Sequence, residues 1–452
     1  MVEKGSSVIN SCCGNHADRV AAYRLINNPR LAMDDVISCL SSDCSASCEG
    51  LSHVLCLQDT TEIVFSHEGR LSLDDKDFGY GTNEREKFCI FAHPGMVLDA
   101  SSRMPVGFGH MKVWSRDRSE ERRKTLRRGR LKLEDKESFR WLETAEKTAS
   151  SLPGGVRVTM VGDRENDVYA VMCKTLACGC DFLVRSMHDR PVDCGVEDGR
   201  TGIKEFMQQQ PVAHEYMLEL RDHKGRKART ARMQLRFARV AIHRSKNCPD
   251  DVPESLSCYC VYAVEDGSTV PAGEAPVEWR LLTSHVVETV EQAVECVEWY
   301  KCRWFIEELF RVCKSEGFRI ESVQLESGAA VKNLIVLTLW AALRCVALKR
   351  AYDEQDEAVP ASLMFNEDEQ ELLCVEMIRL HSRSPRALDG RNPFRENSLP
   401  WAAWIIARLG GWSGYVSAHG KPGYITMKQG MDRFQQHLEI IAYAKNLDVY
   451  KE

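Results

Sequence analysis

The residues best suited to chemistry form one spaced set of polar side chains, Tyr300-x2-Arg303-x3-Glu307-x6-Lys314. At about 100° per residue, the last three fall at about 300°, 340° and 320° from Tyr300, on one narrow stripe of a helix. The opposite arc is apolar and consists of Phe305, Ile306, Leu309, Phe310, Val312 and Cys313. An ordinary amphipathic helix with a solvated polar face gives the same pattern, so the stripe alone leaves both interpretations open.

Two aspartates follow strand-like segments far upstream of this helix. Asp59 comes after Val54–Leu57, and Asp163 comes after Val156–Val161. The predicted elements run strand, two strands, helix, strand, helix and strand, with a further helix after a β-rich segment, which is the order of a ribonuclease-H-like α/β fold. In that fold the two strands lie side by side and parallel, so both aspartates should meet at one sheet edge. Each aspartate could instead cap a turn or a helix.

Three carboxylates brought together from Asp59, Asp163 and Glu307 would raise one another's pKa values unless a cation neutralised them. Hard oxygen ligands select Mg²⁺ or Mn²⁺. Two such ions, about 3.5–4 Å apart, can activate a water or hydroxyl on one side of a phosphodiester and stabilise the leaving oxygen on the other. The sequence therefore predicts phosphoryl transfer with two divalent ions.

The chain resembles the DDE transposases of bacterial insertion sequences, in the IS-four branch that includes the Tn-five transposase. The resemblance covers most of the chain. The motifs that carry it, in order, are AYR with NNP (Ala21–Pro29), LQDTT (Leu57–Thr61), VGDRENDVY (Val161–Tyr169), the Tyr-Arg-Glu-Lys stripe and IARLGGW (Ile406–Trp412). The resemblance implies a metal-dependent endonuclease that carries out DNA transposition and recombination.

The resemblance also assigns roles to individual residues. Asp59, Asp163 and Glu307 would be catalytic and hold the metal ions, and the spacing favours Glu307 over its neighbour Glu308. The implied DNA contacts are Tyr300, Arg303 and Lys314 on phosphates and displaced bases, Trp279 and Trp304 as stacking aromatics, and Arg185 as a further backbone contact. Each tryptophan could equally be a core or sheet residue, and Arg185 an ordinary surface arginine of a strand.

The implied reaction is cut-and-paste transposition. Water would cut one strand at the transposon end, and the freed 3′ hydroxyl would attack the opposite strand to form a hairpin. Water would reopen the hairpin, and the same hydroxyl would then attack target DNA. Extruding a base during hairpin formation costs a few kcal/mol, which an aromatic platform can offset.

The pattern along the 452 residues suggests five regions. The expected regions are a helical N-terminal remnant (1–50), the first part of the ribonuclease-H-like core (51–187), an all-β insertion (188–284), the second part of the core with the catalytic helix (285–352) and a helical C-terminal region expected to dimerise (353–452). We expect double-stranded DNA, both transposon ends and target, as the partner of a homodimer, and no small-molecule substrate.

Composition bounds the remaining possibilities. Hydrophobic residues are 44% and charged residues 28%, as in ordinary globular proteins, and the most apolar run, Leu334–Leu343, is shorter than a membrane span. The 19 cysteines show no CxxC pairs and no secretory leader precedes them, so we expect free thiols, no zinc site and a cytoplasmic protein that associates with the bacterial nucleoid when it binds DNA.

Charge is unevenly distributed. The net charge is −6, yet Arg116–Lys132 holds nine basic and three acidic residues. This segment is either a mobile basic loop or a contact to phosphates.

The first 21 residues form only a short segment, and this segment is not basic. The family usually has a DNA-recognising helical segment there. We expect either a translation start upstream of Met1 or an N-terminally shortened product. The alternative function is therefore a non-mobile homologue that binds DNA or transposase subunits and inhibits transposition. A weaker alternative is a ribonuclease-H-like nuclease without strand transfer.

Overall fold

The computed structural model divides the chain into two compact units, residues 1–49, 60–122 and 305–452 in the first and residues 50–59 and 123–304 in the second. The described residues are 16–65, 78–82, 88–116, 133–193, 199–220, 227–244, 248, 251–315, 317–325, 327–383 and 391–449. Most of the basic segment 116–132, including all of it after Arg116, lies outside these residues.

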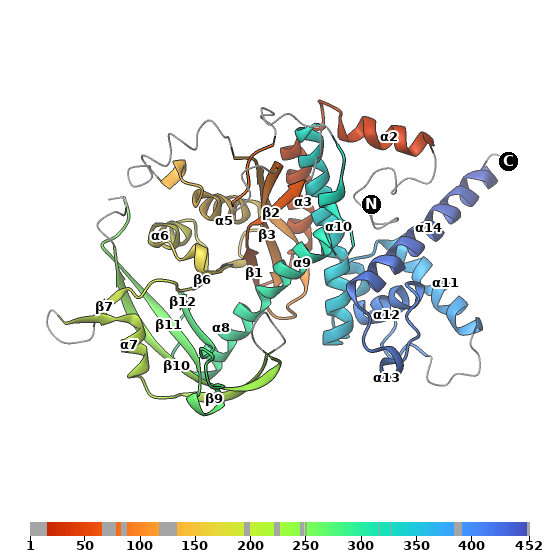
Figure 1. Ribbon diagram of the computed structural model, residues 1–452. Coiled ribbons are helices and arrows are strands. Elements are labelled where there is room, and N and C mark those ends of the chain that lie inside the picture. The colour runs from red at the N-terminus through yellow and green to blue at the C-terminus, as the bar shows by residue number, and fades with distance from the viewer. Residues whose placement is uncertain are drawn as a thin grey trace. The chain divides into compact units, whose positions relative to one another are not determined.

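The second unit is built on a mixed sheet with the strand order β1-β5-β6-β12-β11-β10-β7-β8, and β9 pairs with β10. The strands are β1 (His53–Gln58), β5 (Arg157–Gly162), β6 (Asp181–Arg185), β7 (Pro191–Asp193), β8 (Arg200–Gly202), β9 (His214–Leu220), β10 (Arg229–His243), β11 (Ser255–Glu265) and β12 (Glu278–Thr283). The β1–β5 and β5–β6 pairs are parallel, and the other pairs of this unit are antiparallel. The long antiparallel strands β10 and β11 are at the lower left of Figure 1.

Helices complete this unit. They are α5 (Phe139–Ser151), α6 (Tyr169–Ala177), α7 (Ile203–Gln208) and α8 (Val290–Cys302), with the 3₁₀ turns η2 (Leu133–Asp135), η3 (Arg164–Asn166) and η4 (Gly267–Thr269). The β5-α6-β6 segment is the predicted β-α-β unit with parallel strands. Trp141, Phe182 and Tyr262 are fully buried in the core that these elements share. Burial of such large side chains is the main force that holds the helices on the sheet.

Among its described residues, the segment expected to be all-β, 188–284, contains six strands and also the helix α7. The β-rich character of this segment is therefore confirmed, but its all-β character is wrong because of α7. Helix α7 could not be predicted, because six residues are too few to display helical periodicity.

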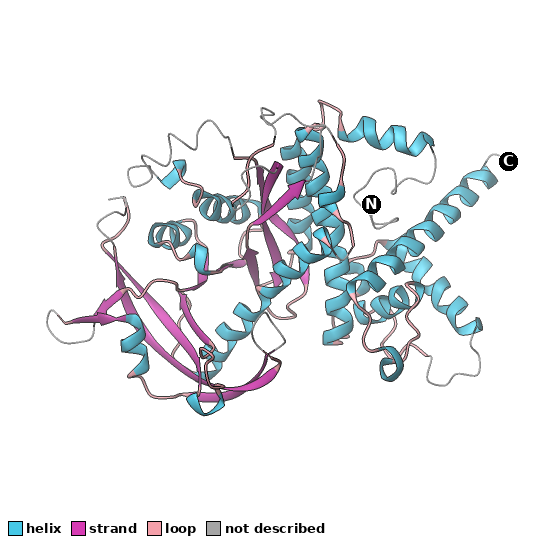
Figure 2. Ribbon diagram, viewed as in Figure 1, coloured by secondary structure: helices cyan, strands magenta, loops and turns pink. Residues whose placement is uncertain are grey.

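The first unit contains a three-stranded antiparallel sheet, β2 (Thr61–Phe65), β3 (Phe88–Asp99) and β4 (Pro105–Trp114). Its helices, cyan in Figure 2 with those of the other unit, are α2 (His16–Ile26), α3 (Met33–Ser47), α9 (Trp304–Lys314, in this unit from Phe305 on), α10 (Gly328–Glu354), α11 (Glu367–Arg383), α12 (Leu399–Leu409), α13 (Val416–His419) and α14 (Tyr424–Val449), with the 3₁₀ turns η5 (Ile320–Ser322) and η6 (Ala361–Leu363). The helices expected in the C-terminal region are thus present among the described residues.

The helix α10 is the centre of this unit and packs on α3, α12, α14 and β4. It extends well beyond the apolar run Leu334–Leu343. Among the described residues it is the one helix long and apolar enough to cross a membrane, and 78% of its most apolar window is buried inside the protein. Core helices share this length and composition, so α10 is weak support for a membrane span.

Two glycines allow α12 and α14 to touch along their backbones. A Cβ atom at Gly430 would overlap the carbonyl oxygen of Ile406, and one at Gly410 would overlap that of Thr426. Neither carbonyl is the end of a flexible side chain, so a helix must shift to admit a methyl group. Close helix packing here therefore depends on glycine.

We expect Gly430→Ala to lower the free energy of unfolding by about 1–3 kcal/mol, because overpacking outweighs the roughly 1 kcal/mol that alanine gains inside a helix. Urea unfolding followed by circular dichroism measures this difference. The matched control is Gly423→Ala, where a Cβ atom meets nothing within 4 Å. Equal stability of the two variants would contradict the packing argument.

Candidate active site

Two carboxylates follow neighbouring parallel strands in the second unit. The register of β1 and β5 pairs Leu57 with Val161, and Asp59 and Asp163 each come two residues later. Neighbouring strands lie about 4.8 Å apart. Both aspartates are half-buried, so the predicted sheet edge carries two partly solvated acids.

The turn after β5 fixes the backbone of Asp163. Its Oδ1 atom accepts a hydrogen bond from the amide of Glu165 at 2.8 Å, which caps the 3₁₀ turn η3. A Cβ atom at Gly162 would overlap the buried side chain of Asn166, so glycine is needed just before Asp163. Asp163 therefore does act as a cap. The element that it caps is the 3₁₀ turn η3, which ends at Asn166, and not an α-helix.

Arg303 connects Asp59 to two aromatic residues. Its Nη1 atom donates to Asp59 Oδ2 at 3.2 Å, and its guanidinium carbon lies 5.9 Å from the ring centroid of Tyr300. The rings of Tyr300 and Trp279 meet edge to face with centroids 5.8 Å apart. The structure thus brings the predicted residues Asp59, Trp279, Tyr300 and Arg303 into one connected group.

Arginines crowd this group. Burial lowers the pKa of Arg185, and the positive charges of Arg164 and Arg303 lower it further, against an opposing effect of Tyr300. Burial likewise raises the pKa of the Tyr300 hydroxyl, whereas Arg303 and Arg185 lower it. Like charges held close together are favourable only with an anion nearby. Arg164 was missed by the sequence argument, although it directly follows Asp163.

A pocket of about 550 Å³ opens beside these arginines. Its charged and aromatic lining consists of Arg164, Arg185, Lys204, Glu278, Trp279 and Arg280. The Nη2 atom of Arg185 donates to the Glu278 carbonyl oxygen at 2.8 Å, which fixes the guanidinium at the pocket wall. Four basic residues against one acidic residue give the lining an excess of positive charge, and Trp279 adds an aromatic surface.

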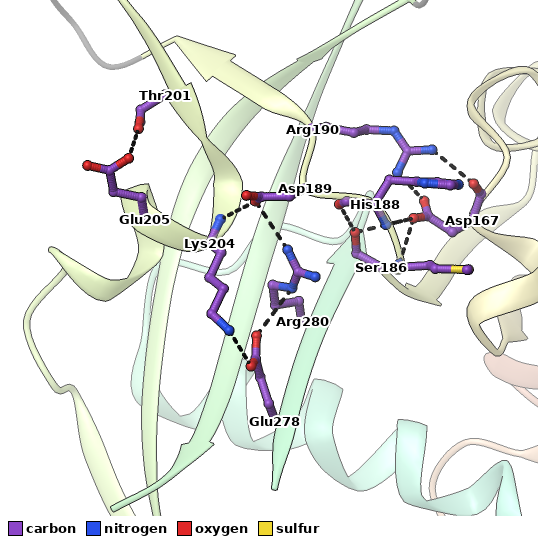
Figure 3. Close-up of polar contacts among 11 residues, drawn as sticks. Asp167, Ser186, His188, Asp189, Arg190, Thr201, Lys204, Glu205, Glu278 and Arg280 are labelled. Atoms are coloured by element: carbon purple, nitrogen blue, oxygen red, sulfur yellow. Dashed lines mark hydrogen bonds and ion pairs between the residues drawn. The ribbon is translucent and has the colours of Figure 1, made fainter. Parts of the chain in front are cut away.

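Two of the basic residues in this pocket already have acidic partners. The Nζ atom of Lys204 lies 2.8 Å from Glu278 Oε2, and Arg280 lies 3.5 Å from Glu278 and 3.3 Å from Asp189 (Figure 3). Sequence spacing offered no signal for Lys204, because it stands on the unpredicted helix α7.

The single helix expected to carry Tyr300, Arg303, Glu307 and Lys314 is interrupted. Helix α8 ends at Cys302, Arg303 forms a turn, and α9 begins at Trp304. Tyr300 is buried with 5% of its surface exposed, so it does not lie on a solvated stripe. A projection onto a single helix cannot predict this interruption. The backbone dihedrals of Arg303 remain helical, and only the hydrogen-bond pattern changes there.

Within α9 the predicted amphipathic pattern is confirmed. All six residues predicted for its apolar face are buried, Glu307 in its first turn is half-buried, and Trp304 has 49% of its surface exposed. In the first unit, Lys314 Nζ donates to the Glu62 carbonyl oxygen and lies 3.7 Å from Glu321. Glu307 and Lys314 thus belong to the first unit, whereas the group around Asp59 and Asp163 belongs to the second.

Glu308, the rival acid, has a structural role. Its carboxylate accepts a hydrogen bond from the Tyr424 hydroxyl of α14 and lies 3.7 Å from Arg311. Burial and the Glu308 carboxylate both raise the pKa of Tyr424. Glu308 therefore joins α9 to α14, which leaves Glu307 as the better candidate for chemistry.

The strands that carry the two aspartates are tied together at their opposite ends. Thr159 Oγ1 forms hydrogen bonds with His53 Nε2 at 2.8 Å and with His285 Nε2 at 2.7 Å. Both imidazoles pack against buried Trp299 of α8, with centroids 4.9 Å away in each case. These hydrogen bonds and ring contacts, together called the relay below, connect β1, β5, α8 and the segment after β12.

The mixed α/β sheet with two acids at neighbouring strand ends is consistent with the ribonuclease-H-like class of enzymes. The family model described as the transposase DDE domain matches residues 57–344, well over half of the chain. The chain belongs to this family of transposases, which bind and cleave DNA and generally use divalent metal ions. The match spans every site residue predicted from the sequence, and it confirms the resemblance to DDE transposases.

The donor chemistry of the site fits such ions. Within the part of the chain that the structure describes, no three His, Cys, Asp or Glu side chains form a group able to hold a metal. Asp59 and Asp163 nevertheless offer the hard carboxylate oxygens that Mg²⁺ and Mn²⁺ prefer. The ion pair with Arg303 partly neutralises Asp59.

His285 makes the stability of this unit depend on pH. Burial lowers its pKa, Asp181 opposes this effect, and Arg157 and His53 add to it, so that the pKa is lowered to about 4. An unfolded histidine titrates near 6.5, so the neutral ring stabilises the fold fully above pH 6.5, and this contribution is lost as the pH falls towards 4. We expect a loss of about 2–3 kcal/mol between pH 7 and 4.5, measured by urea unfolding.

The variant His285→Gln should remove most of this loss, because glutamine does not titrate. His243→Gln replaces a histidine of the same unit outside the relay and should retain the loss. If wild type and His285→Gln lose the same stability between the two pH values, the assignment to His285 is wrong.

Proposed function

We propose that this protein is a cut-and-paste transposase of the IS-four branch, with the Tyr-Arg-Glu-Lys signature formed by Tyr300, Arg303, Glu307 and Lys314. The observation that carries the proposal is the cluster of Arg164, Arg185 and Arg303 beside two strand-end aspartates. A cationic group next to paired carboxylates suits a phosphodiester, which needs positive charge around it and acids that hold metal ions.

Asp59, Asp163 and Glu307 are the proposed ligands of two Mg²⁺ or Mn²⁺ ions. When bound, the ions would supply Lewis acidity on both sides of the scissile phosphodiester. Support comes from the parallel register of β1 and β5, and from the separate engagement of Glu308 with Tyr424. In the sequence Glu307 follows Arg303, the ion-pair partner of Asp59, by about one helical turn.

The proposed DNA contacts divide into two kinds. Arg185, Arg303, Tyr300 and Lys314 would contact phosphates, whereas Trp279 and Trp304 would stack on unpaired bases. The edge-to-face contact of Trp279 with Tyr300 and its place in the basic pocket support the first tryptophan. The 49% exposure of Trp304 supports the second, because a large exposed aromatic ring is available to a partner.

The proposed sequence of steps is nicking by water, hairpin formation by the 3′ hydroxyl, hairpin opening by water and strand transfer to target DNA. Each step exchanges one phosphodiester oxygen for another, so no redox partner is needed. The arginine group would hold the same phosphates through successive attacks while a nucleotide leaves the duplex.

The remaining expectations extend the same proposal. Residues 188–284 would be an insertion in the ribonuclease-H-like core, and the C-terminal helices would form a homodimer contact on DNA. The protein would act in the bacterial cytoplasm, on the nucleoid.

Replacing any of the three acids by alanine, in Asp59→Ala, Asp163→Ala or Glu307→Ala, should reduce Mg²⁺-dependent cleavage by about 10³-fold or more. The assay uses DNA that carries the ends of the element, and circular dichroism checks folding. Glu308→Gln is the matched control and should keep cleavage, since Glu308 joins α9 to α14.

The outcomes separate the alternatives. Retained cleavage in one alanine variant removes that residue from the triad. DNA binding without cleavage by wild type favours the non-catalytic inhibitor, and cleavage without strand transfer favours a simple nuclease.

Trp279→Ala should slow hairpin formation about 10- to 100-fold while changing first-strand nicking much less, because stacking of one base contributes about 1–3 kcal/mol. Single-turnover gels resolve the two steps. Trp340→Ala, which removes a partly exposed tryptophan of α10, is the control. Equal slowing of both steps by Trp279→Ala would show that Trp279 is structural.

A further inference from the structure

A fully buried carboxylate lies four residues after Asp163. The side chain of Asp167 has 0% exposure. Its Oδ2 atom accepts hydrogen bonds from the amides of Met187 at 2.7 Å and His188 at 3.0 Å, and from Ser186 Oγ at 3.3 Å. Arg190 completes the group, donating to Asp167 Oδ1 and to its carbonyl oxygen (Figure 3).

Every one of these donors comes from the short segment Ser186–Arg190, here called the β6 loop because it directly follows β6. A buried carboxylate is tolerated only when it is paired and its oxygens are hydrogen-bonded. Asp167 therefore favours the one conformation of the β6 loop in which all these donors converge.

The β6 loop is also held from its outer side. Asp189 Oδ1 accepts a hydrogen bond from the Lys204 amide at 2.9 Å and from Arg280 Nη1 at 3.3 Å, and the Ser186 amide donates to the Arg280 carbonyl oxygen at 2.7 Å. In Figure 3 the Asp189 carboxylate, itself in this loop, meets Lys204 and Arg280, whereas Asp167 meets Ser186 and Arg190 from another segment. Asp167 is the interior anchor and Asp189 the exterior one.

The anchored segment forms part of the basic pocket. Ser186 and Met187 line it, and Arg185 at its wall immediately precedes the loop. Met187 has 59% of its surface exposed although its amide is fixed by Asp167. An exposed apolar side chain on a fixed backbone, beside Trp279 and two arginines, suits the face of a base whose phosphate meets the arginines.

We propose that Asp167 is a positioning residue for the pocket, which binds one unpaired nucleotide of DNA. It sets Arg185 and Met187 through the β6 loop, and it links this loop to the turn that carries Asp163. The inference rests on the proposed function, because it assumes a DNA substrate. It adds a residue that touches neither DNA nor metal and acts through the loop.

The test is a binding experiment that needs neither metal nor cleavage. The probe is a duplex of arbitrary sequence with one unpaired 2-aminopurine and a fluorescein at one end. Fluorescein anisotropy gives the overall affinity, and 2-aminopurine fluorescence reports stacking in the pocket. Trp279→Ala calibrates the signal that corresponds to an empty pocket.

Asp167→Asn should keep the overall dissociation constant within about threefold, since most phosphate contacts remain, but should lose more than half of the 2-aminopurine response. The matched control is Asp181→Asn at the opposite end of β6, where the carboxylate pairs with Arg157 at 2.6 Å and with Ser284. This control should keep the full response.

If Asp167→Asn fails to fold, Asp189→Asn decides the matter, because Asp189 is exposed and its loss loosens only the outer anchor. A reduced response at unchanged affinity supports the inference. An undiminished response in a folded variant, or equal losses in Asp167→Asn and Asp181→Asn, overturns it.

No 2-aminopurine response in wild-type protein that binds the duplex also overturns the inference, since the pocket would not take a nucleotide. The proposed catalytic function is untouched by that result, because its own test is cleavage with Mg²⁺. The two proposals can therefore fail separately.

Discussion

The parallel pairing of β1 with β5 is the constraint from which the site follows. Its register sets Asp59 and Asp163 at matching positions beyond neighbouring strands. A slip of one residue would turn the side chains of one strand to the other face of the sheet. The relay through Thr159 and the two histidines fixes the strands at the far end, while Gly162 and Asn166 shape the turn at the near end. Both acids therefore owe their position first to the sheet, and the Glu165 amide and Arg303 hold Asp163 and Asp59, respectively, through direct contacts.

Positively charged side chains gather beside the two aspartates at the strand ends. Burial lowers the pKa of Arg185, the nearby charges of Arg164 and Arg303 lower it further, and Arg303 also pairs with Asp59. Such an arrangement is costly in isolation and becomes favourable when phosphate enters. The protein thus gives up some stability at this cluster, as functional sites commonly do, and the proposed phosphate contacts would restore it.

Much of the fold and of the site could be predicted from the sequence, because strand signals are local, and so is the position of Asp59 and of Asp163 just after a strand. The longer strands, the β-α-β unit and the buried face of α9 could be predicted for that reason, whereas the three-residue strands β7 and β8 could not. Lys204, Arg280 and the role of Asp167 could not be, since they depend on long-range strand pairing and on a helix too short to show a period. The turn at Arg303 and the burial of Tyr300 likewise arise from tertiary packing.

The carboxylate of Glu278 has a consequence for how DNA affinity varies with ionic strength. It already neutralises Lys204 and contacts Arg280, so these two cations displace few condensed counterions when a nucleic acid arrives. Arg164 and Arg185 are not the ion-pair partners of this carboxylate. They would therefore account for more of the pocket's contribution to the salt dependence of DNA affinity. The pocket would thereby hold a strand with fewer effective charges than its composition suggests, which favours ready release of the DNA.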